Sequence, residues 1–99
     1  MAQHRSVDLP FVPLGSHTTN SSLSSAVTLT PATGATMLMI QSTGQNVRYT
    51  LDGTVPTASV GFRLTPGDGA VILPISPTSV VKVIQEAASG TVGYQWGRL

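Results

Sequence analysis

Short runs of alternating apolar and polar residues, each ended by glycine or proline, are the feature that most restricts how this chain can fold. Residues 26–30 and 46–51 alternate at period two, as half-buried strands do. Residues 70–75 form another such run, and Pro74 favours an edge strand for it because proline cannot donate to a ladder. No stretch shows the apolar spacing of an amphipathic helix. The pattern therefore predicts an all-β protein.

Two pairs of neighbouring runs have the spacing of β-hairpins. Run 36–43 meets run 46–51 at Gly44, and run 79–87 turns directly into run 91–96. Six or seven short strands in 99 residues predict a single small antiparallel β-sandwich, immunoglobulin-like in connectivity, or a small barrel. A chain of this length has room for one domain.

The N-terminal part of the chain looks different from the rest. Residues 1–23 combine an apolar stretch held extended by two prolines with a small, polar stretch, so we expect an extended arm preceding a sandwich over residues 24–99. We expect an arm of this kind to be held in place by a neighbouring protein. The arm residues expected to contact that partner are Leu9, Phe11, Val12 and Leu14.

Charged residues are scarce. They make up 9% of the chain, against roughly 25% in an average soluble protein. A solitary domain usually stays dispersed through interspersed charges, so the deficit indicates a surface that meets other proteins. A threonine-rich β protein with its hydroxyl groups in water is an equal alternative, since the chain has thirteen threonines and eleven serines. The five basic residues are scattered singly, which argues against a nucleic-acid partner.

Other segments bear on the cellular context. There is no cysteine, and therefore no disulfide or thiolate metal site. The first residues lack the apolar run of a cleavable signal peptide, and no segment has the roughly 18 apolar residues of a membrane span. We expect a soluble protein made in the cytoplasm, without a membrane partner.

The ionisable groups predict no catalysis. Asp52 and Asp68 lie in glycine-containing turns, where aspartate ordinarily accepts backbone hydrogen bonds, and Glu86 reads as a solvated or cross-strand charge. His4 and His17 lie in the expected arm, which lacks the scaffold that a metal site or a catalytic triad needs. No serine occurs in a nucleophile elbow. The expectation is a protein that is not an enzyme and carries no metal or cofactor.

The aromatic residues allow two interpretations. Tyr49, Tyr94 and Trp96 can pack in the core, which is favoured because the chain has only five aromatic residues. Alternatively, Tyr94 and Trp96 share one strand face and could form an exposed platform on which sugar rings stack.

A turn interrupts the chain after residue 51. Asp52 can accept a hydrogen bond from the backbone ahead of it in an Asx turn, and Gly53 tolerates a positive φ. Pro56 then fixes φ and removes a ladder donor. We expect the chain to leave its sheet at this corner and cross elsewhere.

The same stretch carries a family resemblance. Residues 49–57, YTLDGTVPT, resemble the YTxDGxxPT signature of chitobiase C-terminal-type β-sandwich modules. The longer run 45–68 resembles small, stand-alone proteins encoded among the structural genes of tailed bacteriophages, and the resemblance spans about residues 40–97. It implies structural roles for the turn residues Tyr49, Asp52, Gly53, Thr54, Pro56 and Thr57.

The resemblance implies a component of a virion. The leading expectation is a capsid decoration or cement protein that binds across neighbouring subunits, with a head-to-tail connector or tail protein as the alternative. Its partners would be the major capsid protein or other virion proteins, bound as a homo-oligomer or on a lattice. The competing class is a carbohydrate-binding module, suggested by the sugar-hydrolase relatives of the motif.

Overall fold

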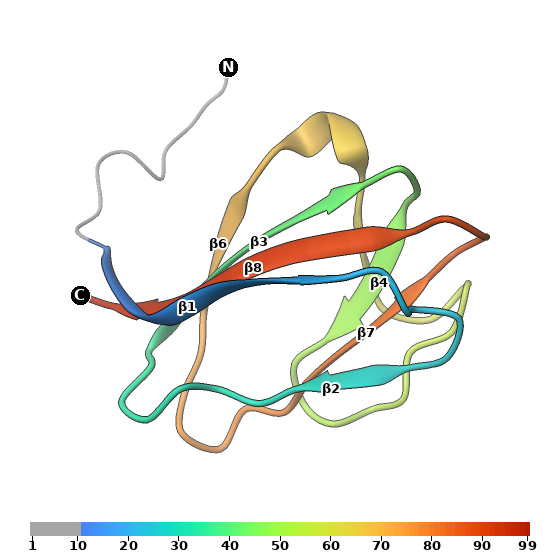
Figure 1. The fold of residues 1–99 in the computed structure, drawn as a ribbon. Coiled ribbons are helices and arrows are strands. Elements are labelled where there is room, and N and C mark those ends of the chain that lie inside the picture. The colour runs from blue at the N-terminus through green and yellow to red at the C-terminus, as the bar shows by residue number, and fades with distance from the viewer. Residues whose placement is uncertain (1–10) are drawn as a thin grey trace.

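The computed structural model describes residues 11–99, and in them the chain is all-β, as predicted. Within this described part, eight strands are joined by loops and one 3₁₀ turn, and Figure 1 shows their arrangement. The strands are β1 (Val12–Asn20), β2 (Val27–Leu29), β3 (Met37–Thr43), β4 (Val47–Thr50), β5 (Phe62–Leu64), β6 (Val71–Pro74), β7 (Val81–Gln85) and β8 (Thr91–Arg98). The 3₁₀ turn is η2 (Pro66–Asp68).

The strands form two four-stranded antiparallel sheets. Sheet A has the order β1-β8-β3-β6, and sheet B has the order β2-β7-β4-β5. In Figure 1, β1, β8 and β3 lie side by side in one layer, while β2 and β7 lie in the other. The predicted antiparallel sandwich is therefore confirmed.

The strand order differs from the immunoglobulin-like arrangement that was predicted. Pairing joins β1 with β8, β2 with β7, β3 with β6 and β4 with β5. The first strand thus pairs with the last, the second with the second to last, and so on toward the middle of the chain. This is the order of a long antiparallel ribbon wrapped into two sheets, the jelly roll. In an immunoglobulin sandwich, neighbouring strands pair within a sheet more often, whereas here only β4 and β5 are both consecutive and paired.

Both predicted hairpins are wrong. The loop after β3 leads into β4 of the other sheet, and the loop after β7 likewise leads from sheet B into sheet A. Instead, β3 pairs with β8 and β4 pairs with β7. The two loops therefore fold one continuous ribbon over, from one sheet to the other. A short glycine-containing connection is compatible with both a corner between sheets and a hairpin turn. The sequence pattern alone therefore could not distinguish the two, and the hairpin prediction was wrong.

The two corner loops are stacked on each other. The Glu86 backbone N–H donates to the Asn46 carbonyl at 2.9 Å. Gly44 has φ +80°, and a Cβ there would lie 2.5 Å from the Ser89 carbonyl oxygen. Since that oxygen belongs to backbone, a side chain at residue 44 would force the loops apart. Glycine at this position permits the close approach.

The expectation at the Asp52 corner is wrong in the opposite sense. The chain leaves β4 there but stays with sheet B, because residues 51–61 loop out and return to β4 as β5. Val47 faces Leu64 and Tyr49 faces Phe62 across this pair. The connection that looked like a crossing is thus the one that remains within its sheet.

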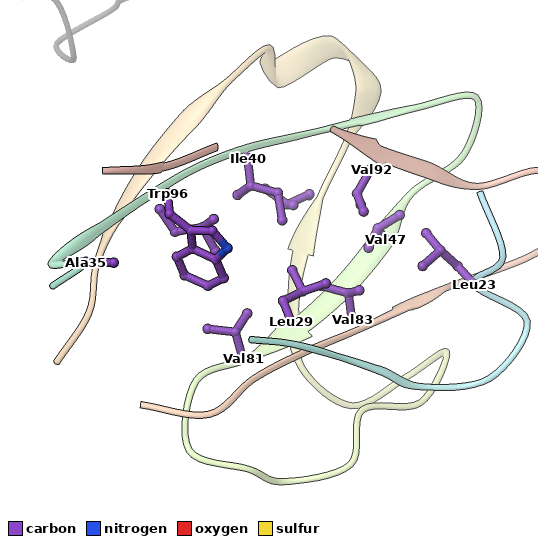
Figure 2. Packing of buried hydrophobic residues seen from close by; sticks show 11 residues of the cluster. Leu23, Leu29, Ala35, Ile40, Val47, Val81, Val83, Val92 and Trp96 are labelled. Carbon is purple, nitrogen blue, oxygen red and sulfur yellow. The ribbon is translucent and has the colours of Figure 1, made fainter. Parts of the chain in front are cut away.

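The core lies between the sheets and follows the predicted alternation. Val81 and Val83 of β7 have no exposed surface, and in Figure 2 Trp96 and Ile40 of sheet A extend toward the side chains of sheet B. Each fully buried valine, leucine or isoleucine contributes about 1.5–3 kcal/mol relative to an exposed one. The cluster comprises Leu23, Leu29, Ala35, Leu38, Ile40, Val47, Leu64, Val81, Val83, Val92 and Trp96.

The expected arm is, over residues 12–20, an edge strand of the sandwich. Val12 lies opposite Arg98, Leu14 opposite Trp96, and the pairing continues to Asn20 after an irregularity. The domain therefore includes β1, and the predicted boundary at residue 24 is too late. The prolines that suggested a separate arm are compatible with an edge strand, because such a strand has one unpaired side.

All four sheet edges have features that discourage pairing with another strand. β1 is interrupted between Leu14 and Thr18, where Gly15 has φ +74°. β6 ends in Pro74, as predicted for an edge, and β2 and β5 have three residues each. Such devices suppress edge-to-edge association. Contacts with other proteins are therefore expected through faces and loops.

Candidate interaction surfaces

The corner after β4 has the predicted local geometry. The Thr54 backbone N–H donates to Asp52 Oδ1 at 3.0 Å, which closes the Asx turn, and Gly53 has φ +88°. A Cβ on Gly53 would meet Val80 Cβ at an ordinary 3.6 Å. Glycine is therefore required here by the backbone conformation and not by lack of space.

Further hydrogen bonds hold the corner against β7. The Gly53 N–H donates to the Val80 carbonyl at 3.1 Å, and the Val80 N–H donates to the Leu51 carbonyl at 3.0 Å. The Thr50 hydroxyl donates to the Thr54 carbonyl at 2.5 Å. Beyond the turn Pro56 is fully buried and Thr57 forms a bridge with Val60. The loop 51–61 is thus a fixed structure.

Tyr49, one of the residues expected to have a structural role here, packs against Phe62. Its ring lies 5.5 Å from the Phe62 ring at an angle of 41°, and it borders the core. Burial raises the pKa of the Tyr49 hydroxyl, which therefore remains protonated at neutral pH. The two rings are thus a cross-strand pair between β4 and the edge strand β5.

A pocket of about 490 Å³ opens beside the corner, and we call it the corner pocket. Phe62 is 64% exposed here and Val60 is 46% exposed. Phe62 and the buried Leu64 are two residues apart on β5 and share a face, which is the face toward the core. The sequence pattern therefore gave no reason to single out Phe62 as an exposed residue. The pocket is lined by Thr50, Leu51, Asp52, Thr54, Val60, Gly61 and Phe62.

The aromatic residues of β8 do not form a platform. Trp96 is 6% exposed, and its ring meets that of Tyr94 edge to face, with centroids 6.0 Å apart and an interplanar angle of 76°. Even-numbered residues of β8 point into the sandwich, which confirms core packing for Trp96. The flat sugar-stacking surface is therefore wrong for this pair.

The odd-numbered positions of β8 face outward, and two of them lie under aromatic side chains of residues 11–20. A Cβ on Gly97 would overlap the Phe11 ring, and one on Gly93 would lie 3.2 Å from the His17 ring. Between them, the Gln95 side-chain amide donates to the carbonyl of Leu14 at 3.0 Å. Phe11 and Leu14 thus contact their own chain. Val12 is 40% exposed, and Leu9 lies outside the described residues.

Formal charge is distributed unequally between the two outer faces. In the four strands of sheet A, Arg98 is the only residue with a formal charge, and it lies at the end of β8. The outer face of sheet B instead carries Arg48, Arg63 and Lys82, which alternate with the buried side chains of their strands. Over residues 11–99, the strands of sheet A therefore present no formal charge on their outer face, which we call the uncharged face.

Glu86 has the cross-strand role that was one of its two interpretations. Its Oε2 accepts from Arg48 Nε at 2.6 Å and from Arg63 Nε at 2.8 Å. The hydrogen bond from Arg63, followed by that from Arg48, lowers the pKa of Glu86. These partners are 38 and 23 residues away in sequence, so no local pattern marked them.

The remaining ionisable groups stand in turns or alone. Asp68 Oδ2 accepts from the Thr65 N–H at 3.2 Å, as expected for a turn aspartate. His17 is exposed with Thr19 as its neighbour at 3.4 Å, and His4 lies outside the described residues. Over residues 11–99, no group of three histidine, aspartate or glutamate side chains could hold a metal ion. The same residues include no helix long and apolar enough to span a bilayer.

The fold and its surfaces define a small jelly-roll sandwich with one charged and one uncharged outer face. Comparisons with protein-family models, with curated proteins and with solved structures find no match. Function is therefore argued from the residues and their geometry.

Proposed function

We propose that this protein is a non-enzymatic structural component of a bacteriophage particle, a capsid decoration protein that binds across neighbouring subunits. The observation that carries the proposal is the uncharged outer face of sheet A. A head-to-tail connector or tail protein would use the same face, and binding to isolated components distinguishes these locations.

The side chains of that face suit a protein contact. Met39 and Ile72 lie opposite each other on β3 and β6, half-buried and pointing away from the core. Interface centres are depleted in charged residues and enriched in methionine. Burying this face against a capsid would desolvate no formal charge, whereas burying the face of sheet B would desolvate several.

Two further observations support the proposal. The blunted edges leave faces and loops as the surfaces available to a partner. In addition, the jelly roll is a fold found in viral capsid domains, a link that rests on analogy of fold alone. A small domain on a symmetric particle repeats its contact many times, so even a modest face contributes to stability of the shell.

The test introduces one charge on each face in turn. Gln41 is exposed on the outer face of sheet A, and Thr28 is exposed on the outer face of sheet B. We expect the wild-type protein and Thr28→Glu to co-sediment with phage capsids at a fixed stoichiometry. Gln41→Glu should weaken binding at least about tenfold, since an unpaired interfacial charge costs more than 1.4 kcal/mol.

Three results would count against decoration. Equal binding by Gln41→Glu would remove sheet A as the contact. Binding of the wild-type protein to connector or tail preparations, but not to capsids, would move it to that part of the particle. No binding to any virion component would overturn the structural role.

A further inference from the structure

The corner pocket combines apolar walls with one carboxylate. Leu51, Val60 and Phe62 supply the apolar surface, and Asp52 is the only ionisable side chain among the lining residues that the structure describes. Its volume of about 490 Å³ is large enough for a long side chain. The pocket is thus amphipathic, with an anionic group and an aromatic ring both in its lining.

Val60 and Phe62 are left exposed by the local fold, while Leu51 also packs against the core. The loop is fixed by the hydrogen bonds of the corner, the bridge between Thr57 and Val60 and the burial of Pro56, so it does not collapse onto Phe62. Val55, in the same loop as Val60, is also exposed, at 59%. Clustered exposed apolar residues on a rigid frame mark sites of interaction.

Among residues 11–99, no basic side chain forms an ion pair with Asp52. Asp52 Oδ1 accepts a hydrogen bond from the Thr54 backbone N–H at 3.0 Å. Hydrogen bonds from Thr54 lower the pKa of Asp52, so the carboxylate is ionised at neutral pH. Arg48 reaches the pocket wall at the Gly61 carbonyl, but its Nε is held by Glu86.

We propose that the corner pocket binds a lysine or arginine side chain of a partner protein. The methylene stem would lie on Val60 and Phe62, and the cationic head would pair with Asp52. Basic side chains combine these two requirements, because they bury an apolar stem while the charged head stays at the rim. A cation beside an aromatic ring is further stabilised by the ring quadrupole. An acidic ligand would be repelled, and a purely apolar one would leave the carboxylate unused.

The direct test is a ¹⁵N NMR titration with two blocked tripeptides. One is N-acetyl-Gly-Lys-Gly-amide, and the other replaces lysine with norleucine, which keeps an apolar stem but lacks the charge. We expect the lysine peptide to shift the amides of residues 50–54 and 60–62 and to bind about fivefold more tightly than the norleucine peptide. The preference should shrink as salt is raised.

Two variants separate charge from folding. Asp52→Asn removes the charge but keeps a side-chain oxygen for the Thr54 N–H, and it should abolish the lysine preference. Asp68→Asn is the matched control, since Asp68 also caps a turn but lies outside the pocket, and it should leave binding unchanged. Phe62→Ala should weaken both peptides.

Each contrary outcome overturns the proposal. Equal binding of the two peptides would make the pocket a simple apolar site. Lysine binding that survives Asp52→Asn would place the cation elsewhere. Stronger shifts with methyl β-N-acetylglucosaminide than with the lysine peptide would make the pocket a sugar site. A dissociation constant on the order of 20 mM is the weakest affinity that such a contact would have. No shift with either peptide at about 20 mM would therefore show that the pocket does not bind a basic side chain. Because these experiments use the isolated chain, their result is independent of capsid binding.

Discussion

Gly44→Ala adds one methyl group at the point where the two corner loops are stacked, and it therefore tests whether the ribbon folds over there. Two costs are expected for Gly44→Ala. The left-handed conformation, φ +80°, costs an alanine about 1–2 kcal/mol. In addition, the new Cβ would lie 2.5 Å from the Ser89 carbonyl oxygen, and separating the two stacked loops should cost a further ~1–3 kcal/mol.

Gly34 supplies the matched control. It also has a positive φ, +84°, but a Cβ there would meet nothing within 4 Å. Gly34→Ala is therefore destabilised only by its backbone conformation. The difference in unfolding free energy between the two variants isolates the contact between the corner loops. For a domain of this size, each kcal/mol lowers Tm by about 4–8 °C.

The assay is urea unfolding followed by the fluorescence of Trp96, the only tryptophan and a core residue. We expect Gly44→Ala to unfold at lower urea than Gly34→Ala, with the same m-value for both. Equal destabilisation, to within about 0.5 kcal/mol, would mean that the loops 44–46 and 86–90 are not stacked. The jelly-roll path of the ribbon would then be refuted.

Two predictions concern the surfaces. Glu86 has a folded pKa below its unfolded value, so its contribution is present above the unfolded pKa near 4.5 and is lost as pH falls through the folded pKa. Glu86→Gln should therefore flatten the loss of stability on acidification below pH 4.5, and an unchanged pH profile from chemical denaturation would contradict the pairing with the two arginines. Gly97→Ala should displace the Phe11 ring and speed amide hydrogen exchange in Val12 and Leu14, while the amides of β7 stay protected. Unchanged exchange in β1 would show that Phe11 does not secure this strand.

Local features were the ones that the sequence could predict. The Asx turn at Asp52, the positive φ of Gly53 and the buried face of β7 each depend on residues within a few positions of one another. An all-β sandwich follows from the same short-range alternation. Such features survive in any arrangement of the strands, and for that reason they were recoverable.

Pairing over long distances was not recoverable. Gly44 looks the same whether the next strand pairs with β3 or crosses to the other sheet, because the strand that decides the matter, β8, lies about fifty residues further on. The exposure of Phe62 depends on β5 being an edge strand, and the bonds of Glu86 depend on β4, β5 and β7 being neighbours. Each of these facts belongs to the topology and not to a local pattern.

The position of β8 also sets the order in which a newly made chain can fold. β8 is the last strand in the chain, yet it lies between β1 and β3 in sheet A, and β7 likewise lies between β2 and β4 in sheet B. During synthesis the first four strands therefore lack the strands that pair between them. Their apolar side chains stay uncovered until β7 and β8 have been made. Closure of such long loops makes folding slow and leaves strand edges open meanwhile. The chain is thus expected to need its final strand before either sheet is complete, which makes that interval its period of greatest risk for aggregation.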